Sequence, residues 1–369
     1  MGGLRSGDPR RIRKRLRLKP VLLITGHVPA SRRGAFEALG ARVPLTLALF
    51  GGPHQHGAPP GPPPEGVDVR TVGQRDVGRL VASGEFSVVI AGTGGRVALP
   101  LAFAAARRRR VPFVFWAALW HTPTTPAHLA AAPMMRSIYR RADAIVTYGP
   151  HVSAYVAAHG AQGVFVAPQA VDNAFWGAPV DANRDERFRA VFVGRPEPAK
   201  GADVQLEARR SAELSPESSV LVLVGEHPAE LAGVSVAGSL EPAQLRDLYA
   251  RAHVLVVPSI RTSRFVEPWG LVVNEAMNRK CAIIASDAVG AAAGGLVRDE
   301  RNGLVTRAGD AQALAGALRA LAENRAHCAQ LGEQGAQDVA RYTYEAWADG
   351  FVEAIERVSD GAKAGSVEL

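Results

Sequence analysis

The chain has 369 residues, of which 47% are hydrophobic and 21% are charged, and its formal net charge is +8. This length favours two domains, the hydrophobic content provides ample material for a core, and the charged fraction is ordinary for a globular protein. Two cysteines, Cys281 and Cys328, are too few for a disulfide framework or a zinc-binding pattern, which indicates a reducing, cytoplasmic setting. No stretch reaches the ~18 apolar residues of a membrane span, so the chain is expected to be soluble or peripheral.

Positive charge is concentrated in residues 1–19, which hold eight Lys and Arg against Asp8 alone. That sum of +7 leaves about +1 for the other 350 residues, so we expect no binding of nucleic acid by charge. The basic tail lacks the apolar run of a signal peptide and is expected to be disordered. It could contact anionic lipid at the inner face of the membrane, at about 1 kcal/mol per basic residue, or be a solvated extension.

Residues 20–177 alternate short apolar runs with helical patterns and are predicted to form one domain. Strands are predicted over residues 21–26, 45–50, 67–72, 87–91, 112–117, 144–148 and 164–167, and helices over 33–39, 77–83, 98–109 and 134–141. Runs that are apolar throughout suit strands covered on both faces. The alternation therefore predicts an open parallel sheet with helices on both sides.

A second alternation fills residues 187–341, after a linker rich in proline, aspartate and alanine over 178–186. Strands are predicted over residues 190–193, 220–224, 234–237, 254–257 and 282–285, and helices over 202–213, 242–251, 269–278, 311–323 and 325–340. A last helix is predicted within 342–358, followed by a tail over 359–369. The predicted fold is α/β, with two Rossmann-like domains facing each other across a cleft, where ligands bind beyond the carboxyl ends of the strands.

The segment from Glu267 to Glu275 predicts a site for a nucleotide sugar. Pro268 suits the first position of a helix, which makes Glu267 the predicted N-cap and leaves the N–H groups of Trp269, Gly270 and Leu271 free to bind an anion. Glu275 would lie roughly 12 Å further along the helix axis. Two hydroxyl acceptors flanking a phosphate cradle match a sugar joined to a nucleoside through a diphosphate. The alternative is an ordinary helix with two surface glutamates.

A strand that ends at Gly194 is followed by two cations, Arg195 and Lys200, ahead of a predicted helix. Arginine can bind a diphosphate through two parallel hydrogen bonds, while lysine acts as a mobile point charge. The pattern therefore favours a second diphosphate contact at this strand end. Solvated loop cations are the alternative.

Together these segments resemble the GT-B glycosyltransferases of the retaining, family-4 type, over roughly residues 190–325. The resemblance implies that Arg195 and Lys200 hold the diphosphate, that Glu267 contacts the transferred sugar and that Glu275 holds the ribose. The matching stretches are Val193-Gly194-Arg195-Pro196-Glu197-Pro198-Ala199-Lys200-Gly201, Pro258-Ser259, Glu267-Pro268-Trp269-Gly270-Leu271, Glu275-Ala276-Met277, Ile284-Ala285-Ser286-Asp287, Asn302-Gly303-Leu304-Val305 and Gly309-Asp310.

The chain departs from this family pattern at two places. Arg279-Lys280-Cys281-Ala282 replaces a small residue, glycine and proline at one helix-to-strand turn, and the loop over residues 290–295 lacks an acidic residue. The first departure touches no proposed ligand contact, and the role that the acidic residue has in relatives is not carried over to this chain. The resemblance also implies that the C-terminal helix crosses back onto the first domain.

The implied function is transfer of a hexosyl group from a nucleotide-diphosphate sugar to a hydroxyl acceptor, with retention of configuration and without a metal cofactor. The acceptor could be a glycan, a lipid-linked saccharide or a small molecule. Two residues of the first half are catalytic candidates: His27, which directly follows the first strand, and His121, near another strand end. An inverting transferase with His27 as general base stays open, as does a protein that binds nucleotide sugars without catalysis.

Overall fold

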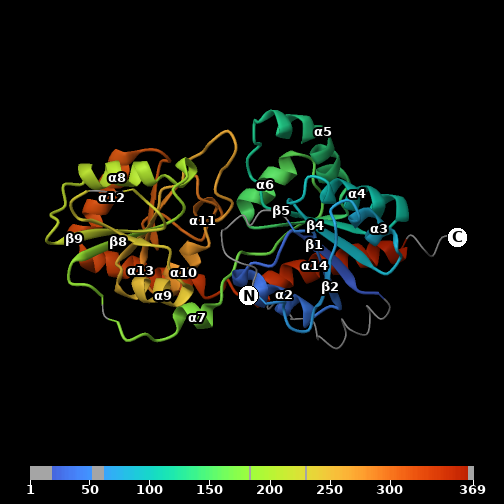
Figure 1. Cartoon of the computed structure of the whole chain (residues 1–369), viewed down its shortest axis with the longest axis horizontal. Helices are drawn as coiled ribbons and strands as arrows, with labels where there is room; N and C mark the ends of the chain where they lie inside the picture. Colours follow the sequence, from blue (N-terminus) through green and yellow to red (C-terminus); the bar gives the residue numbers. More distant parts are fainter. Residues whose placement is uncertain (1–18, 52–61, 183, 229–230, 365–369) are drawn as a thin grey trace, which may run out of the picture.

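The computed structural model describes residues 19–51, 62–182, 184–228 and 231–364, which form two parallel sheets side by side, each covered by helices (Figure 1). The predicted basic tail lies almost wholly outside these residues. The first sheet has the strand order β3-β2-β1-β4-β5-β6-β7. Its strands are β1 (Val21–Thr25), β2 (Leu45–Leu49), β3 (Asp68–Thr71), β4 (Val88–Gly92), β5 (Phe113–Ala117), β6 (Ala144–Thr147) and β7 (Val164–Val166).

The helices of this first domain connect its strands in chain order. They are the 3₁₀ turn η1 (Ala30–Arg32), α2 (Arg33–Gly40), α3 (Val77–Ala82), α4 (Ala98–Arg109), α5 (Pro126–Arg141) and α6 (Pro150–Ala158), with the short α7 (Asn173–Gly177) after β7. Helix α5 begins eight residues before the predicted position. The Thr125 side chain accepts a hydrogen bond from the His128 N–H at 3.4 Å, and Pro126 occupies the first turn, which together satisfy the helix start.

The second sheet has the order β10-β9-β8-β11-β12-β13, and with its helices it forms the second domain. Its strands are β8 (Phe188–Val193), β9 (Ser219–Val224), β10 (Val234–Gly238), β11 (Val254–Val257), β12 (Ala282–Ser286) and β13 (Gly303–Thr306). Its helices are η2 (Pro198–Lys200), α8 (Ala202–Ser211), α9 (Pro242–Arg251), α10 (Val272–Asn278), α11 (Gly290–Ala293), α12 (Ala311–Glu323) and α13 (Arg325–Val339). The predicted α/β architecture of two Rossmann-like domains is confirmed, while β13 was not predicted as a strand.

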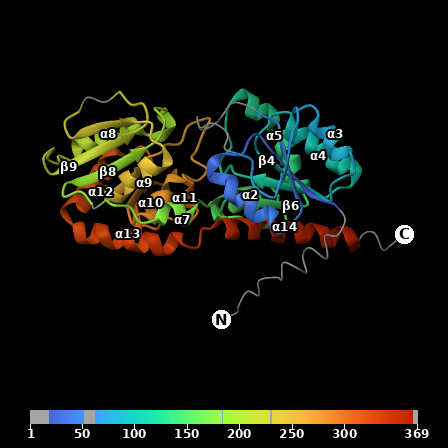
Figure 2. The same cartoon turned by 60° about the horizontal axis from the view of Figure 1, so that its bottom comes forward.

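The C-terminal helix α14 (Tyr344–Ala364) leaves the second domain and packs against the first sheet. Trp347, Phe351 and Ile355 are buried in the first core, four residues apart on one face of the helix. Figure 2 shows α13 and α14 running in succession beneath the two domains. Trp116 also lies in this core, with its ring centroid 5.7 Å from that of Trp347, so it packs the sheet against α14 and is not a surface for substrate. Among the described helices, none is both long and apolar enough to cross a membrane.

Candidate active site

Lys200 and Glu267 form an ion pair at the carboxyl edge of the second sheet. Lys200 ends η2, just after β8, and its ammonium group contacts Glu267 Oε2. The exposed fractions of the two side chains are 21% and 10%. The Ser259 hydroxyl lies 3.5 Å from the same carboxylate oxygen, and the Phe265 ring centroid lies 5.3 Å from the lysine nitrogen. Two residues predicted from distant motifs thus meet in one partly buried pair.

The loop that carries Lys200 is pressed against the end of β11. The Ile260 N–H donates to the Ala199 carbonyl at 2.9 Å. Gly201 has a φ of 74°, and a Cβ added there would lie 2.1 Å from the Pro258 carbonyl oxygen. Only glycine combines this backbone conformation with so close an approach. Glycine at position 201 therefore lets the loop pack close to β11, which places the ammonium group of Lys200 next to Glu267.

Two side chains of the first domain hold the loop that carries Glu267. The indole N–H of Trp120 donates to the Glu267 carbonyl, and Nε2 of His151 donates to the Pro268 carbonyl, each at 3.1 Å. Burial lowers the pKa of His151, against the opposing effect of the Pro268 hydrogen bond, so its ring is neutral near pH 7 with the proton on Nε2. The sequence analysis missed His151, whose position after β6 on the binding edge of a parallel sheet was the available signal.

Glu267 is not a helix N-cap, which corrects the prediction. Helix α10 begins at Val272, because Gly270 has a φ of 90° and so breaks the helical path. Trp269 is buried, and its indole N–H donates to Asn274 at 2.8 Å. Among the described residues, the N–H groups of Trp269, Gly270 and Leu271 find no hydrogen-bond acceptor. The predicted free donors are therefore present, on a loop instead of a helix start.

Arg195 lies two residues beyond β8 and faces solvent. Its guanidinium group contacts Glu197 at 2.8 Å, and both side chains are about half exposed. Gly194 is fixed by its N–H bond to the Val224 carbonyl at 3.2 Å and by His227, whose Nε2 donates to the Gly194 carbonyl at 2.8 Å. In this structure Arg195 does not touch Lys200 or Glu267, and its guanidinium group is held by the surface ion pair with Glu197.

Glu275 lies in α10 instead of two turns beyond a helix start at Glu267, so the 12 Å separation along one helix axis does not apply. The Tyr249 hydroxyl donates to its Oε2 at 3.4 Å. Burial raises the pKa of Glu275 to about 7, which the hydrogen bond from Tyr249 only partly offsets. The carboxyl group is therefore shared between neutral and charged forms near neutral pH.

Replacing Glu275 by Gln should flatten the dependence of stability on pH between pH 5 and 8. The folded chain keeps this proton up to a pKa of about 7, whereas the unfolded chain loses it near 4.5. The contribution of Glu275 to the free energy of unfolding is therefore fully present below the pKa of the unfolded chain. It is lost as pH rises through the pKa of the folded chain. We expect urea unfolding to show a loss of up to about 2–3 kcal/mol in the native chain over this range, and a smaller one in the variant. Equal slopes in the two chains would contradict the raised pKa of Glu275.

The two candidate histidines lie on the first domain. His27 follows β1 and is half-buried. His121 follows β5, and its Nε2 is buried without a hydrogen-bond partner among the described residues. A buried polar nitrogen without a partner costs free energy unless a ligand or water satisfies it. His121 therefore has capacity to bind a group that this chain does not itself supply.

Residues 179–338 match the family described as Glycosyl transferases group 1. The match covers the second domain, hereafter the group 1 domain, and less than half of the whole chain. This group 1 domain contains Arg195, Lys200, Glu267 and Glu275, together with the whole second sheet. The predicted resemblance to GT-B glycosyltransferases, which rests on the same segments, is confirmed, while the retaining family-4 type stays a prediction.

Two curated relatives share the name D-inositol 3-phosphate glycosyltransferase. That of Rhodococcus erythropolis (strain PR4 / NBRC 100887) is 30% identical over 190 residues, which cover 46% of this chain and 41% of the relative. That of Rhodococcus opacus (strain B4) is 32% identical over 184 residues, with 44% and 39% covered. The chain thus spans about two fifths of the length of the curated relatives that it matches.

Solved structures extend the likeness to the first domain. HepE of Anabaena in complex with UDP and glucose has a TM-score of 0.67 at 18% identity and covers 91% of this chain and 99% of its own. Sucrose-phosphate synthase of Thermosynechococcus elongatus has a TM-score of 0.69 at 19% identity, with 93% and 100% covered. At these identities the comparison shows the fold, which is the two-domain GT-B arrangement around the group 1 domain.

Proposed function

We propose that this chain is a glycosyltransferase that moves a hexosyl group from a nucleotide-diphosphate sugar to a hydroxyl acceptor. The observation that carries the proposal is the Lys200–Glu267 pair, placed at the carboxyl edge of the group 1 domain and held by Trp120 and His151 of the other domain. UDP and glucose in the HepE complex, and the transferase names of the curated relatives, support a nucleotide sugar as donor.

The chemistry requires that the charge of the departing diphosphate be stabilised. Lys200 would turn from Glu267 to the diphosphate, which frees the carboxylate to accept hydrogen bonds from the sugar. Arg195 would leave its exposed pair with Glu197 for the same diphosphate. The unpaired N–H groups of residues 269–271 add donors without a net charge. These cations supply the charge that a bound metal supplies elsewhere, so we propose transfer without a metal.

We propose that the reaction retains the anomeric configuration, because four residues match the pattern of retaining transferases in order and spacing. These are Arg195, Lys200, Glu267 and Glu275. The inverting alternative is supported by His27, which stands after β1 at the carboxyl edge of the first sheet, where an imidazole could take the acceptor proton. His121, with its unpartnered Nε2, is proposed to contact the sugar or the acceptor. A protein that binds nucleotide sugars without transfer is the third possibility.

The test is an assay of the full chain with UDP-, GDP- and ADP-sugars, with and without EDTA. We expect release of nucleoside diphosphate from one donor class, unaffected by EDTA. The anomeric proton coupling of fresh product, measured by NMR against that of the donor, gives the stereochemistry. An inverted product would replace the retaining mechanism, and a His27→Ala variant that loses roughly 10²–10⁴-fold in rate would then identify the base. Binding without any release of nucleoside diphosphate would leave only the non-catalytic function.

The acceptor is proposed to be a glycan, a lipid-linked saccharide or a small polyol, the last in line with the names of the curated relatives. A cytoplasmic enzyme in peripheral contact with anionic membrane remains our expectation. It depends on residues 1–19, nearly all of them outside the described part of the chain.

A further inference from the structure

A cavity of about 190 Å³ lies where the two domains meet, and neither Lys200 nor Glu267 lines it. Its walls combine Tyr148 and Val166 of the first domain with Trp269, Arg341 and Tyr342 of the second. A water molecule occupies about 30 Å³ of liquid, so the space equals roughly six waters, enough for the body of a monosaccharide or a small polyol. Three aromatic residues among the walls suit the apolar face of such a ring.

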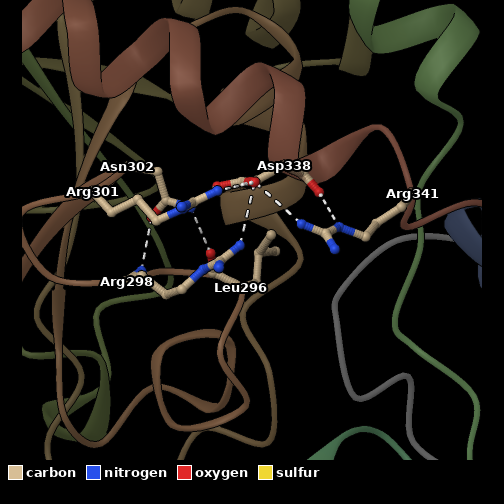
Figure 3. Close-up of polar contacts among 6 residues, drawn as sticks. All are labelled: Leu296, Arg298, Arg301, Asn302, Asp338 and Arg341. Carbon is tan, nitrogen blue, oxygen red and sulfur yellow. Dashed lines mark hydrogen bonds and ion pairs between the residues drawn. The ribbon is translucent and has the colours of Figure 1, made fainter. Parts of the chain in front are cut away.

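Arg341 also belongs to a cluster of three arginines around Asp338 (Figure 3). The side chains of Arg298 and Arg341 each reach Asp338 Oδ1 at 3.2 Å, and Arg301 Nε reaches Oδ2 at 3.3 Å. The Asn302 amide donates to Oδ2 at 2.9 Å. Asp338 is only 5% exposed. Burial alone would raise the pKa of Asp338, but the hydrogen bonds from Arg301 and Asn302 and the arginine charges hold it below its usual value.

This arginine cluster (Arg298, Arg301, Arg341 and Asp338) carries more positive charge than its carboxylate needs. Three guanidinium groups against one carboxylate give these four residues a sum of +2, because the two carboxylates between Arg298 and Arg301 in the sequence contact other groups. The arginine side chains are 40%, 50% and 66% exposed in chain order, so each keeps donors available. Arg298 Nε is buried and has no partner among the described residues. Holding Asp338 in place therefore does not account for the presence of all three arginines.

The cavity and the cluster share Arg341, which lines the cavity and contacts the same Asp338 oxygen as Arg298. Arg341 and Tyr342 both line the cavity, and the charges of Arg341 and Arg298 act on the Tyr342 hydroxyl, lowering a pKa that burial raises overall. We propose that this cavity binds a small sugar or polyol phosphate, with the ring between the aromatic walls and the phosphate on Arg341 and Arg298. A phosphate monoester carries a charge of about −1.5 to −2 near pH 7, which complements the positive charge of the arginine cluster. Guanidinium groups also bind phosphate through paired hydrogen bonds.

This binding site goes beyond the proposed transfer reaction, and its test needs no donor. Titration calorimetry of the full chain with glucose 6-phosphate, inorganic phosphate and glucose measures the affinities. We expect glucose 6-phosphate to bind tightest, inorganic phosphate more weakly and glucose weakest of all. Arg341→Gln should weaken glucose 6-phosphate binding about 10- to 100-fold, since a hydrogen bond to a charged group is lost. Asp338 would keep Arg298, Arg301 and Asn302 in that variant, so the fold should be retained.

Two further variants separate the site from general charge and from folding. Arg319→Gln removes the same charge from an exposed position on α12 and should leave binding unchanged. Val166→Trp fills the cavity from the exposed edge strand β7 and should reduce binding of glucose 6-phosphate but not of inorganic phosphate. Equal affinity of native chain and Arg341→Gln for glucose 6-phosphate, or no binding of either phosphate compound by the native chain, would overturn the proposal.

The sugar or polyol phosphate could reach this cavity as the acceptor of the proposed reaction or as an effector. Mass spectrometry of the bound compound after incubation with donor distinguishes the two. An acceptor gains the mass of a hexosyl residue, and Arg341→Gln then raises its KM. An effector is recovered unchanged while the rate of transfer to another acceptor, or of donor hydrolysis, changes with its concentration.

Discussion

Lys200→Met should lower turnover by about 100-fold or more, by analogy with the loss of one preorganised donor to a developing negative charge. It should also lower stability, because Glu267 is 10% exposed and would lose the one cationic partner that it has among the described residues. Breaking a buried ion pair from one side costs about 3–5 kcal/mol, and the partial exposure of Lys200 places the expected loss at or below the low end. Steady-state kinetics and thermal unfolding measure the two effects.

A double variant separates these effects. Glu267→Gln combined with Lys200→Met removes both charges, so its unfolding temperature should recover toward that of the native chain. Its turnover should stay well below that of Glu267→Gln alone, because the diphosphate still lacks the ammonium group. If the double variant and Glu267→Gln turned over equally, Lys200 would serve only to neutralise Glu267, and its proposed contact with the diphosphate would be wrong.

Most of the fold could be predicted because most strands of the two sheets are apolar runs, although β3 contains Asp68 and Arg70. Strand β11 and helices α4, α9 and α12 have the predicted bounds, since each is a clean apolar run or begins and ends at strong signals. Helix α9 begins with a reciprocal cap between Glu241 and Gln244. Strand β13 was missed because its four residues start with a glycine, whose closeness to β12 is a tertiary effect: a Cβ on Gly303 would lie 2.5 Å from the Ile283 carbonyl oxygen.

The residues of the candidate site could be predicted, but their contacts could not. Motif order brings Lys200 and Glu267 to neighbouring strand ends, yet nothing local shows that they pair in the absence of ligand. The path of the chain after Glu267 depends on the left-handed φ of Gly270, which a glycine permits but does not require. The support from Trp120 and His151 comes from the other domain, and no local pattern encodes a contact between domains.

Gly290→Ala should disturb the site through the backbone of the Glu267 loop, although Gly290 is not itself a proposed ligand contact. The Gly290 N–H donates to the Glu267 carbonyl at 3.0 Å, and the Ala291 N–H donates to the Trp269 carbonyl at 2.8 Å. A Cβ on Gly290 would lie 1.9 Å from the Pro268 carbonyl oxygen and 2.8 Å from the Trp269 Cα, so α11 and the Glu267 loop must move apart. Because these neighbours are backbone atoms, the cost cannot be relieved by a side-chain rotation.

We expect this substitution to destabilise the fold by about 3 kcal/mol, the upper range for overpacking. The affinity for nucleoside diphosphate should also decrease, since the free N–H groups of residues 269–271 belong to the displaced loop. Gly316→Ala is the matched control, because nothing lies within 4 Å of a Cβ there and alanine favours the interior of α12. Urea unfolding and calorimetry with UDP and GDP measure both effects. Full stability with normal binding in Gly290→Ala would show that the close packing of α11 does not hold the Glu267 loop in place.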